Sequence, residues 1–313
     1  MIRYLCRRLA FGAALLALVT SATFFAVYGS SDTVVRSLVG EQASAEQIAE
    51  RTAELGLDRP VQEQFGDWVA HAVTGDLGTS YFTSEPVTQA IGNRLSVTLT
   101  LMICSMVVLA VVSAVLGVLA AVRRGGVVDR ALQIVTETLS AVPKFWLALM
   151  LVIALAINLR LFPATGYAPI SDGVGAWALG IVLPTAAIVL GELRITSMVR
   201  GAVSDELDKP YVRTLRSRGL SESEVLFRHV LRNAAPPWLS LLSMKVVALF
   251  SGVVVIEKVF AVPGIGSLAT DAATSGDIPI LMGVVVTTVA IIFVVYLVFD
   301  LVQAWLNPKV RLT

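Results

Sequence analysis

The side chains that could do chemistry in this sequence lie in or beside long apolar segments. They are the ionisable residues Lys144, Glu192, Arg194, Lys245 and Asp300. Charged groups inside a membrane are costly, and they often serve ion transport or proton transfer. A proton relay requires several such groups aligned across the bilayer, and the outer halves of the apolar segments lack them. Lys144 lies deepest, and we expect the others to pair, Glu192 or Asp300 with Lys245, or to extend toward the membrane surface.

Sequence patterns for catalysis, metal binding and cofactor binding are missing. There is no GxxxxGK phosphate-binding loop, no HExxH zinc motif, and no Ser/His or paired-Asp arrangement within the apolar segments. The two histidines, His71 and His229, form no ligand cluster with the two cysteines. We expect no catalytic residues, no metal and no cofactor.

The composition predicts an all-α polytopic membrane protein. The 313 residues are 56% hydrophobic and only 15% charged, with a mean hydropathy of +0.79, whereas an average soluble domain has about a quarter charged residues. The first apolar run is too long for a typical signal peptide and lacks a clear small-x-small cleavage site, which favours a retained span. Pro143 interrupts the third span, where a kink is tolerated if neighbours satisfy the freed carbonyl. Six spans are expected, at residues 9–28, 96–122, 131–159, 177–198, 238–256 and 280–305.

The distribution of Lys and Arg predicts the orientation in the cell membrane. About fifteen of these residues lie in the N-terminus, the loop near Arg123, the stretch after span four and the C-terminal tail, and about six lie on the opposite side. Cytoplasmic loops carry the excess of Lys and Arg. We therefore expect both termini in the cytoplasm and residues 29–95 outside. The resulting division is a tail and first span over 1–28, an extracytoplasmic domain over 29–95 and a transmembrane domain over 96–313.

The extracytoplasmic segment is polar, with two helices expected. One spans residues 42–55 and ends at Gly56, and the second opens at Pro60. An apolar stripe at helical spacing runs along the second helix. We expect this stripe to pack against the membrane part of the chain rather than to bind a ligand. It comprises Val61, Phe65, Trp68, Val69 and Ala72.

A basic loop over residues 199–237 separates spans four and five and predicts two short helices joined at Gly219. Asp208 is placed to N-cap the first helix, with Pro210 in its first turn. Gly219 is placed to end that helix in a left-handed cap, with Leu220 as the apolar contact. The run from Ser221 to Glu224 matches a capping box that opens the second helix. Two prolines, Pro236 and Pro237, are then expected to stop it.

This loop has three possible interpretations: a positive-inside topology loop, a patch for anionic lipid, and a docking helix for a cytoplasmic partner. Neither of the first two needs helix caps or an apolar ridge. The first helix has such a ridge at Tyr211, Val212 and Leu215. The second has apolar residues at i, i+3, i+4 and i+7, so that one helix could anchor on the membrane bundle while the other faces a partner. These residues are Phe227, Val230, Leu231 and Ala234. The docking interpretation is favoured.

The residues from 211 to 237 read YVRTLRSRGLSESEVLFRHVLRNAAPP. This stretch resembles the cytoplasmic loop of ABC-importer permeases of the binding-protein-dependent transport family. It is most similar to the first permease of the dipeptide, oligopeptide and nickel branch. Further segments resemble that branch in the same order along the chain: GLDRPVQEQFGDWV with GDLGTSY, NRLSVTLTL, LFPATGY, VIEKVFAVPGIGSL and NPKVR.

The resemblance implies a permease subunit of an ATP-driven importer, forming half of the translocation path for peptides or a similar small solute. The implied partners are a second permease subunit, two ABC ATPase subunits that hydrolyse ATP, an extracytoplasmic solute-binding protein and membrane lipid, with no nucleic acid. The first helix of the loop would dock on an ATPase. The implied coupling residues are Tyr211, Val212, Arg213, Thr214, Leu215, Arg216, Ser217, Arg218, Gly219, Leu220, Glu224 and His229.

Some residues depart from the pattern of that branch. Leu215 stands where a small residue is common, and Lys209–Pro210 replaces the usual residues before the tyrosine. Two alternatives stay open at this point. A secondary transporter or channel without an ATPase would use the intramembrane charges, and a membrane receptor or scaffold would bind partners without solute flux. Neither alternative requires the helix–Gly–helix loop.

Overall fold

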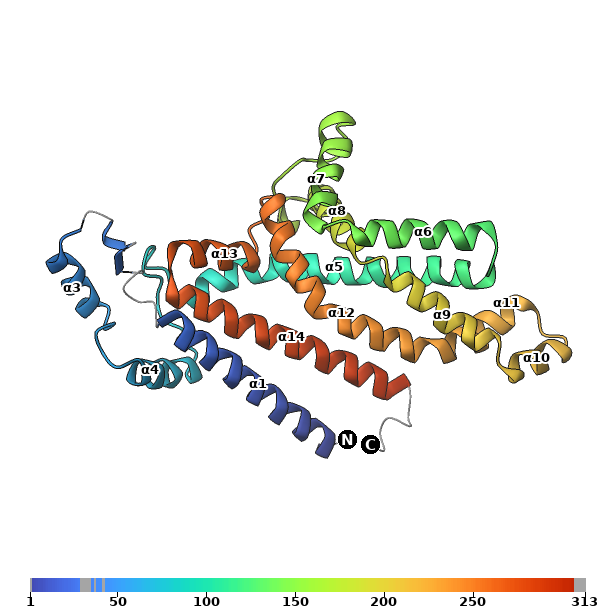
Figure 1. Ribbon diagram of the computed structural model, residues 1–313, viewed down its shortest axis with the longest axis horizontal. Coiled ribbons are helices and arrows are strands. Elements are labelled where there is room, and N and C mark those ends of the chain that lie inside the picture. Colours follow the sequence, from blue (N-terminus) through green and yellow to red (C-terminus); the bar gives the residue numbers. More distant parts are fainter. Residues whose placement is uncertain (1, 29–34, 37, 41–42, 307–313) are drawn as a thin grey trace. The chain divides into compact units, whose positions relative to one another are not determined.

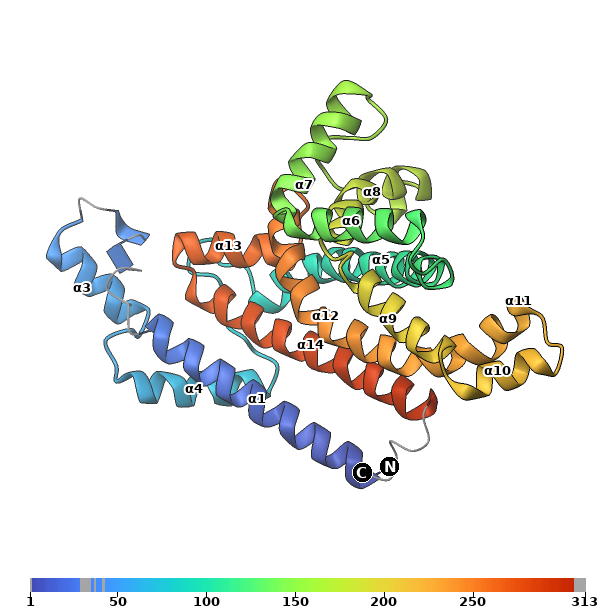
Figure 2. The same ribbon diagram turned by 45° about the vertical axis from the view of Figure 1, so that its right-hand side comes forward.

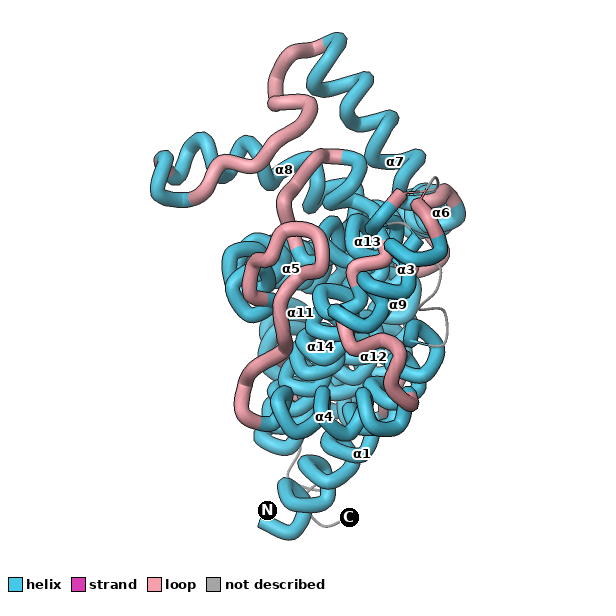
Figure 3. Tube along the Cα trace, turned by 90° about the vertical axis from the view of Figure 1, so that its left-hand side faces the viewer, coloured by secondary structure: helices cyan, strands magenta, loops and turns pink. Residues whose placement is uncertain are grey.

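The computed structural model describes residues 2–28, 35–36, 38–40 and 43–306. Helices make up almost all of this part of the chain, and no β-strand occurs within it beyond one isolated bridge between Thr79 and Pro86 (Figure 3). The chain divides into two compact units. One comprises residues 1–98 and 263–294, and the other comprises residues 99–262 and 295–313. The three-part division expected from the sequence stays a prediction.

The expected all-α membrane fold is confirmed. Among the described residues, five helices are long and apolar enough to cross a membrane, or six if a bent pair counts as one span. Three of them are α1 (Ile2–Tyr28), α5 (Val87–Val122) and α14 (Ile278–Leu306). The others are α8 (Val174–Gly191) and a continuous helical run from Glu222 to Val259 that ends in α12 (Leu231–Val259). The bent pair is residues 127–141 with 144–158.

The first unit contains the two polar-segment helices, α3 (Ala45–Glu54) and α4 (Val61–Val73). Ser44 and Gln47 form a reciprocal capping box at the start of α3, which satisfies two N–H groups that the helix itself leaves free. The helix ends before Gly56, which has a φ of +65°. The sequence expectation for this pair of helices is therefore confirmed.

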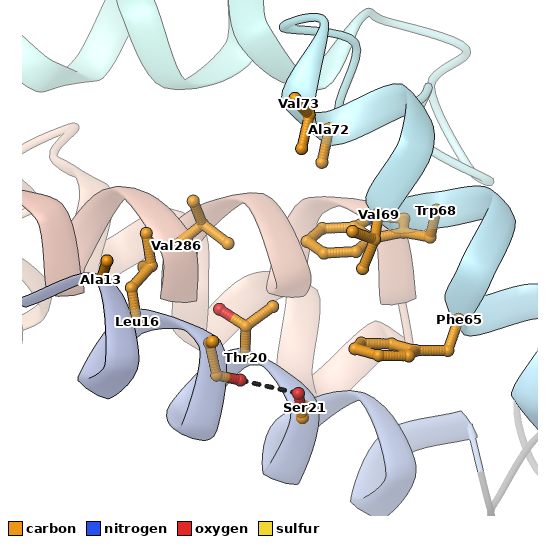
Figure 4. A pocket seen from close by; sticks show the side chains of 11 residues that line it. Ala13, Leu16, Thr20, Ser21, Phe65, Trp68, Val69, Ala72, Val73 and Val286 are labelled. Carbon is orange, nitrogen blue, oxygen red and sulfur yellow. Dashed lines mark hydrogen bonds between the residues drawn. The ribbon is translucent and has the colours of Figure 1, made fainter. Parts of the chain in front are cut away.

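The apolar stripe of α4 packs on α1, as expected. The ring of Phe24 lies 5.1 Å from that of Phe65 and 6.1 Å from that of Trp68, separations at which aromatic pairs attract. Figure 4 shows the side chains of α1 and α4 facing the same space, an apolar cavity of about 530 Å³ with Leu16 on one wall and Val69 on the other. The cavity lining is almost entirely apolar, which agrees with a packing role for the stripe.

A second packed cluster in this unit is formed by the short helix α13 (Ile265–Ser275), the first turns of α5 and the start of α14. Two polar contacts fix its ends. The backbone N–H of Ile265 donates to the hydroxyl of Thr98 at 2.8 Å, and the Ser80 hydroxyl donates to the Asp277 carboxylate at 2.5 Å. Ser80 and Asp277 are both buried. The PGIGSL loop of the sequence is thus a buried, capped helix.

In the second unit, the third span is broken rather than kinked. α6 (Val127–Ala141) and α7 (Lys144–Leu151) meet at 104°, and α7 continues as a π-helical segment, η1 (Val152–Asn158). A residue that precedes proline is driven out of the α conformation. Val142, before Pro143, has the extended ψ of 134°. The sequence showed the interruption but not its size.

The fourth span ends earlier than the sequence predicted. α8 stops at Gly191, and a separate helix, α9 (Ile195–Leu207), begins after a three-residue turn. The turn is held by the backbone N–H of Arg194, which donates to the Ser140 hydroxyl of α6 at 2.8 Å. The expected span over residues 177–198 is therefore wrong at its C-terminal end. The hydropathy pattern continues across the break, so it gave no sign of the turn.

The expectation that Pro236 and Pro237 stop the helix is also wrong. Both prolines lie inside α12. Each removes an N–H that the carbonyl four residues earlier would accept. Just before them the backbone is wound as a π-helix, η3 (Val225–Val230), a geometry with a different hydrogen-bond spacing. The loop's second helix is thus continuous with the fifth span.

Candidate functional site

The basic loop between spans four and five forms a helical hairpin. α10 (Pro210–Ser217) runs outward from the end of α9, and the chain returns through α11 (Glu222–Glu224) and η3 into α12. Figures 1 and 2 both show α10 and α11 side by side at the end of the α9 and α12 pair. The local helix–Gly–helix pattern was correctly predicted.

The N-terminal cap of α10 differs from the expectation. The cap residue is Lys209, which makes no side-chain cap, and Pro210 occupies the first turn as expected. Asp208 instead ends α9, and its carboxylate accepts a hydrogen bond from Arg124 at 2.6 Å. Asp208 therefore connects this hairpin to the loop after α5 rather than capping α10.

Gly219 ends α10 as predicted. Its φ is +84°, and its N–H donates to the carbonyl of Arg216 at 3.0 Å. The N–H of Leu220 donates to the carbonyl of Leu215 at 3.3 Å, which completes a Schellman motif. Leu220 is half-buried in the apolar cluster beneath the hairpin. This geometry needs a residue that adopts positive φ without strain.

The turn after Gly219 is held by three further contacts. The Ser221 hydroxyl accepts from the backbone N–H of Glu224 at 3.2 Å, which is one half of the expected capping box. The Glu224 carboxylate accepts from Arg228 at 3.2 Å. Arg216 donates to Glu222 through two hydrogen bonds of 2.8 and 2.9 Å, a paired geometry that joins the two arms across the turn.

The apolar ridge of α10 packs against the chain itself, which corrects the expectation for Val212, whereas a partner contact of Tyr211 and Leu215 stays a prediction. Val212 is 0% exposed, and Tyr211 and Leu215 are half-buried in the same cluster. This hairpin cluster also includes side chains of α5, α9, η3 and α12. Its buried members are Ala121, Val199, Val203, Val212, Val225, Val230 and Ala234. Burial of this ridge is what attaches α10 to the rest of the unit.

The outward face of the hairpin is basic and polar. Arg213, Thr214, Arg216, Ser217, Arg218 and Gly219 are exposed, whereas Glu224 and His229 are half-buried. One large apolar side chain joins this surface, because Phe227 is 69% exposed. Sequence spacing had placed Phe227 on the same stripe as Val230 and Ala234. The π-helical winding of η3 changes the number of residues per turn, so a 3.6-residue pattern misplaces Phe227.

A polar network that the sequence did not reveal fixes the first turn of α10. Glu206 is buried, pairs with Lys209, and accepts a hydrogen bond from the Tyr211 hydroxyl at 2.8 Å. That hydroxyl also accepts from Asn233 of α12 at 3.3 Å. Burial acts to raise the pKa of Glu206, but the hydrogen bonds from Lys209 and Tyr211 outweigh it and lower the pKa below the ordinary value.

The base of α9 is anchored by a buried ion pair. Arg200 donates to both oxygens of Asp129, at 2.5 and 2.7 Å, and Asp129 is 1% exposed. The same carboxylate accepts from the N–H of Gly125 at 2.8 Å and from Gln133 at 2.7 Å. A buried charge is tolerated only when it is paired and fully hydrogen-bonded. This ion pair holds α9, from which the hairpin extends, against α6.

The intramembrane charges pair, as expected, but more extensively than the sequence indicated. Glu192 accepts from Lys245 at 2.7 Å and also lies 2.6 Å from the ammonium of Lys144. No partner was predicted for Lys144, the deepest of these charges. It joins Lys245 around one carboxylate, where the break after α8 meets the break before α7.

Comparison with known proteins identifies the family. The chain matches the model described as "Binding-protein-dependent transport system inner membrane component" over residues 113–312. It also matches "Binding-prot-dependent transport system membrane comp, N-term" over residues 1–102. The chain belongs to this family. The family resemblance read from the sequence is thereby confirmed.

Curated relatives cover the whole chain. A probable peptide ABC transporter permease protein, y4tP of Sinorhizobium fredii, is 34% identical over 98% of this chain and 99% of its own length. The metal-staphylopine import system permease protein CntB of Staphylococcus aureus is 32% identical, with 99% of each chain covered. The dipeptide transport system permease protein DppB of Lactococcus lactis is 31% identical, with 100% of each chain covered.

The fold has a counterpart among solved structures. A chain of the inward-facing MetNI methionine ABC transporter aligns with a TM-score of 0.57 at 15% identity, covering 72% of this chain and 100% of that chain. At this identity the likeness concerns the fold alone. The family match and the relatives make the chain a permease subunit of an ABC importer, multi-pass in the cell membrane. The secondary-transporter and receptor alternatives are not supported.

Proposed function

We propose that this permease subunit forms half of a translocation path for peptides or a related small solute. The substrate class is taken from the relatives, which are named for peptide, dipeptide and metal-staphylopine transport. An extracytoplasmic solute-binding protein would deliver the solute on the side of residues 29–95. ATP hydrolysis would take place on separate ATPase subunits. This chain supplies its half of the path and the mechanical connection from the ATPases to the membrane helices.

The hairpin is the proposed contact with the ATPase. The observation that carries this proposal is continuity: α11, η3 and α12 form one helical run from Glu222 to Val259. α10 is attached to that run by Val212 and by the Tyr211–Asn233 hydrogen bond. A displacement of α10 is therefore transmitted to the fifth span. The proposed contact surface is the exposed face of the hairpin, namely Arg213, Thr214, Arg216, Ser217, Arg218, Gly219 and Phe227.

The complete assembly would contain a second permease subunit and two ATPase subunits in the lipid bilayer. Both termini and the hairpin would face the cytoplasm, in line with the excess of Lys and Arg there. ATP binding and the loaded binding protein must each favour one state of the membrane helices over the other, because a ligand shifts an equilibrium only by its differential affinity. The hairpin transmits to the membrane helices the preference for one state that ATP binding creates.

Uptake by the reconstituted complex tests this function. The chain is purified with its partner permease and ATPases, placed in proteoliposomes and supplied with its binding protein and external solute. We expect uptake that requires internal ATP and persists in the presence of an ionophore, with the solute identified by mass spectrometry. Uptake that stops with the ionophore and ignores ATP depletion would overturn the proposal. Replacing an exposed hairpin arginine such as Arg213 with glutamine should reduce the ATP-dependent uptake. The same replacement at Arg130, which is exposed and outside the hairpin, is the matched control.

A further inference from the structure

Two lysines and one glutamate meet between three helices of the second unit. The Glu192 carboxylate lies 2.6 Å from the ammonium of Lys144 and 2.7 Å from that of Lys245. Lys144 opens α7, Glu192 ends α8, and Lys245 lies within α12. The Glu192 side chain is 6% exposed, and those of the lysines are 22% and 28% exposed. This triad is therefore largely withdrawn from solvent.

The chain makes specific room for the Lys144 side chain. A Cβ atom at Gly191 would come within 2.7 Å of its Cγ, and a Cβ at Gly252 would come within 2.8 Å of its Nζ. The ammonium also donates to the carbonyl of Ala248 at 3.1 Å. The lysine stem thus runs through a slot between two glycines on facing helices. Such a fit holds the ammonium in one place.

The triad carries one positive charge too many. Two ammonium groups share a single carboxylate, and the described contacts of Lys144 and Lys245 include no second acid. A buried charge in a membrane protein is costly unless a counter-charge compensates it. Arg194 adds another cation beside the triad, and its guanidinium lies 3.6 Å from Glu137. An anion is the species that such a site lacks.

A cavity of about 410 Å³ opens beside these groups, within the size range of small-molecule sites. It is lined by the triad, by Arg194 and Ser140, and by residues on either side of the two helix breaks, Ala141, Val142, Pro143 and Gly191. Metal cations are repelled by this surplus of positive charge. A carboxylate suits it, because ammonium groups make strong, short hydrogen bonds to carboxylate oxygens.

We propose that this cavity binds the carboxylate of the transported solute, with Lys144 and Lys245 as its ligands. The inference rests on the proposed transport function and narrows its substrate class to solutes that carry a free carboxylate. The α-carboxylate of a short peptide fits this class. Glu192 then keeps the two ammonium groups together when the site is empty, and the solute carboxylate supplies the missing negative charge.

Equilibrium binding to the purified complex in lipid nanodiscs tests the site without the binding protein. The two probes are trialanine and trialanine amide, which differ only in the carboxylate. We expect the free acid to bind at least about tenfold more tightly than the amide. Lys245→Gln leaves a neutral Lys144–Glu192 pair and should reduce that preference to near one. Lys245→Arg keeps the charge and should retain most of the preference, and Arg130→Gln should not change it.

Several results would overturn the inference. They are equal binding of the two probes, no binding of either, or a preference that survives Lys245→Gln. Equal binding would also be the outcome if an acidic side chain of the second permease subunit filled the cavity. ATP-dependent uptake by the same complex is measured in parallel. Uptake without a carboxylate preference defeats this inference alone, whereas absence of ATP-dependent uptake defeats the proposed function.

Discussion

Two short helices of this chain, α10 and α13, end in the same way but have different surroundings. Each is followed by a glycine in the left-handed conformation, Gly219 with a φ of +84° and Gly276 with a φ of +79°. In both, the residue after the glycine donates its N–H back into the helix, Leu220 to Leu215 and Asp277 to Ala272. The local chemistry of termination is therefore shared.

What surrounds the two helices differs. α13 has five buried residues and packs against α5 and α14 within its unit, and Asp277 after it is buried with Ser80. α10 has one buried residue, Val212, and an outward face of charged and polar side chains. A capped helix alone is therefore no indicator of a partner site. The feature that distinguishes α10 from α13 is its exposed face of basic and polar side chains.

The largest effect is expected from a charge placed on the inner face of α10. Val212→Asp puts an unpaired carboxylate at a site with 0% exposure, a change that costs about 4 kcal/mol or more. The hairpin should detach, and trypsin should cleave at its arginines more than tenfold faster. Arg213→Asp alters an exposed neighbour and should leave resistance at the remaining sites unchanged. Equal protease resistance of Val212→Asp and the unaltered chain would contradict the attachment described here.

The second effect concerns α13. Asp277→Ala removes the acceptor of the buried Ser80 hydroxyl, and an unsatisfied buried donor costs about 1–3 kcal/mol. The purified protein should melt at a lower temperature, while trypsin cleavage of the α10 hairpin stays unchanged. Glu46→Ala, at an exposed acid of α3, is the control and should not shift the melting temperature. Faster cleavage at the hairpin in Asp277→Ala would show that the two helices are not independent.

Local rules predicted the end of α10 well because caps depend on a few neighbouring residues, but the segment that forms α13 was expected to be a loop. Gly219, Pro210 and the first helix of the polar segment were read correctly for that reason. Features that depend on distant partners were predicted only in part. The pair of Glu192 with Lys245 was expected from their opposite charges, but the contacts of Glu192 with Lys144 and of Asp208 with Arg124 were not. No spacing rule connects residues that are about 50 or more positions apart.

Backbone irregularity was the other source of error. The 104° break at Pro143, the turn after Gly191 and the π-helical η3 all occur within continuous apolar patterns. Hydropathy reports whether a segment suits a membrane but not whether its helix is regular. The consequence for the site was direct. Phe227 was expected on one stripe with Val230 and Ala234, but it is exposed, whereas Val230 and Ala234 are buried.

A third prediction concerns the glycine cap of α10. Gly219→Val imposes a positive φ on a β-branched residue, at a cost of about 1–2 kcal/mol, although no atom would obstruct the new side chain. Transport per ATP hydrolysed should fall, because the turn relaxes and α10 loses its fixed orientation. Gly219→Asn, which tolerates positive φ better, should retain most of the coupling. Unchanged coupling in Gly219→Val would separate the cap from energy transfer.

A smaller, pH-dependent effect is expected at Glu206. Its pKa in the folded protein is lower than its ordinary value of 4.5. The stability that it contributes is therefore present above about pH 4.5 and is lost as the pH falls through its folded pKa. Glu206→Gln should lower the melting temperature at pH 7 by the equivalent of about 1 kcal/mol. That difference should shrink at pH 4, and a difference independent of pH would contradict the ionised network.

The smallest effect on the chain's own stability is expected from Phe227→Ala. This variant tests most sharply whether the exposed basic face of the hairpin, which α13 lacks, binds a partner. The side chain is 69% exposed, so Phe227→Ala should change the melting temperature by no more than the equivalent of about 0.5 kcal/mol. If the outward face of the hairpin binds an ATPase, the same variant should weaken co-purification of the ATPase subunits, because an exposed aromatic side chain that becomes buried contributes strongly to an interface. Val73→Ala removes a side chain that is 83% exposed on α4 and should have neither effect. Normal ATPase association in Phe227→Ala would restrict the contact to the polar face of α10.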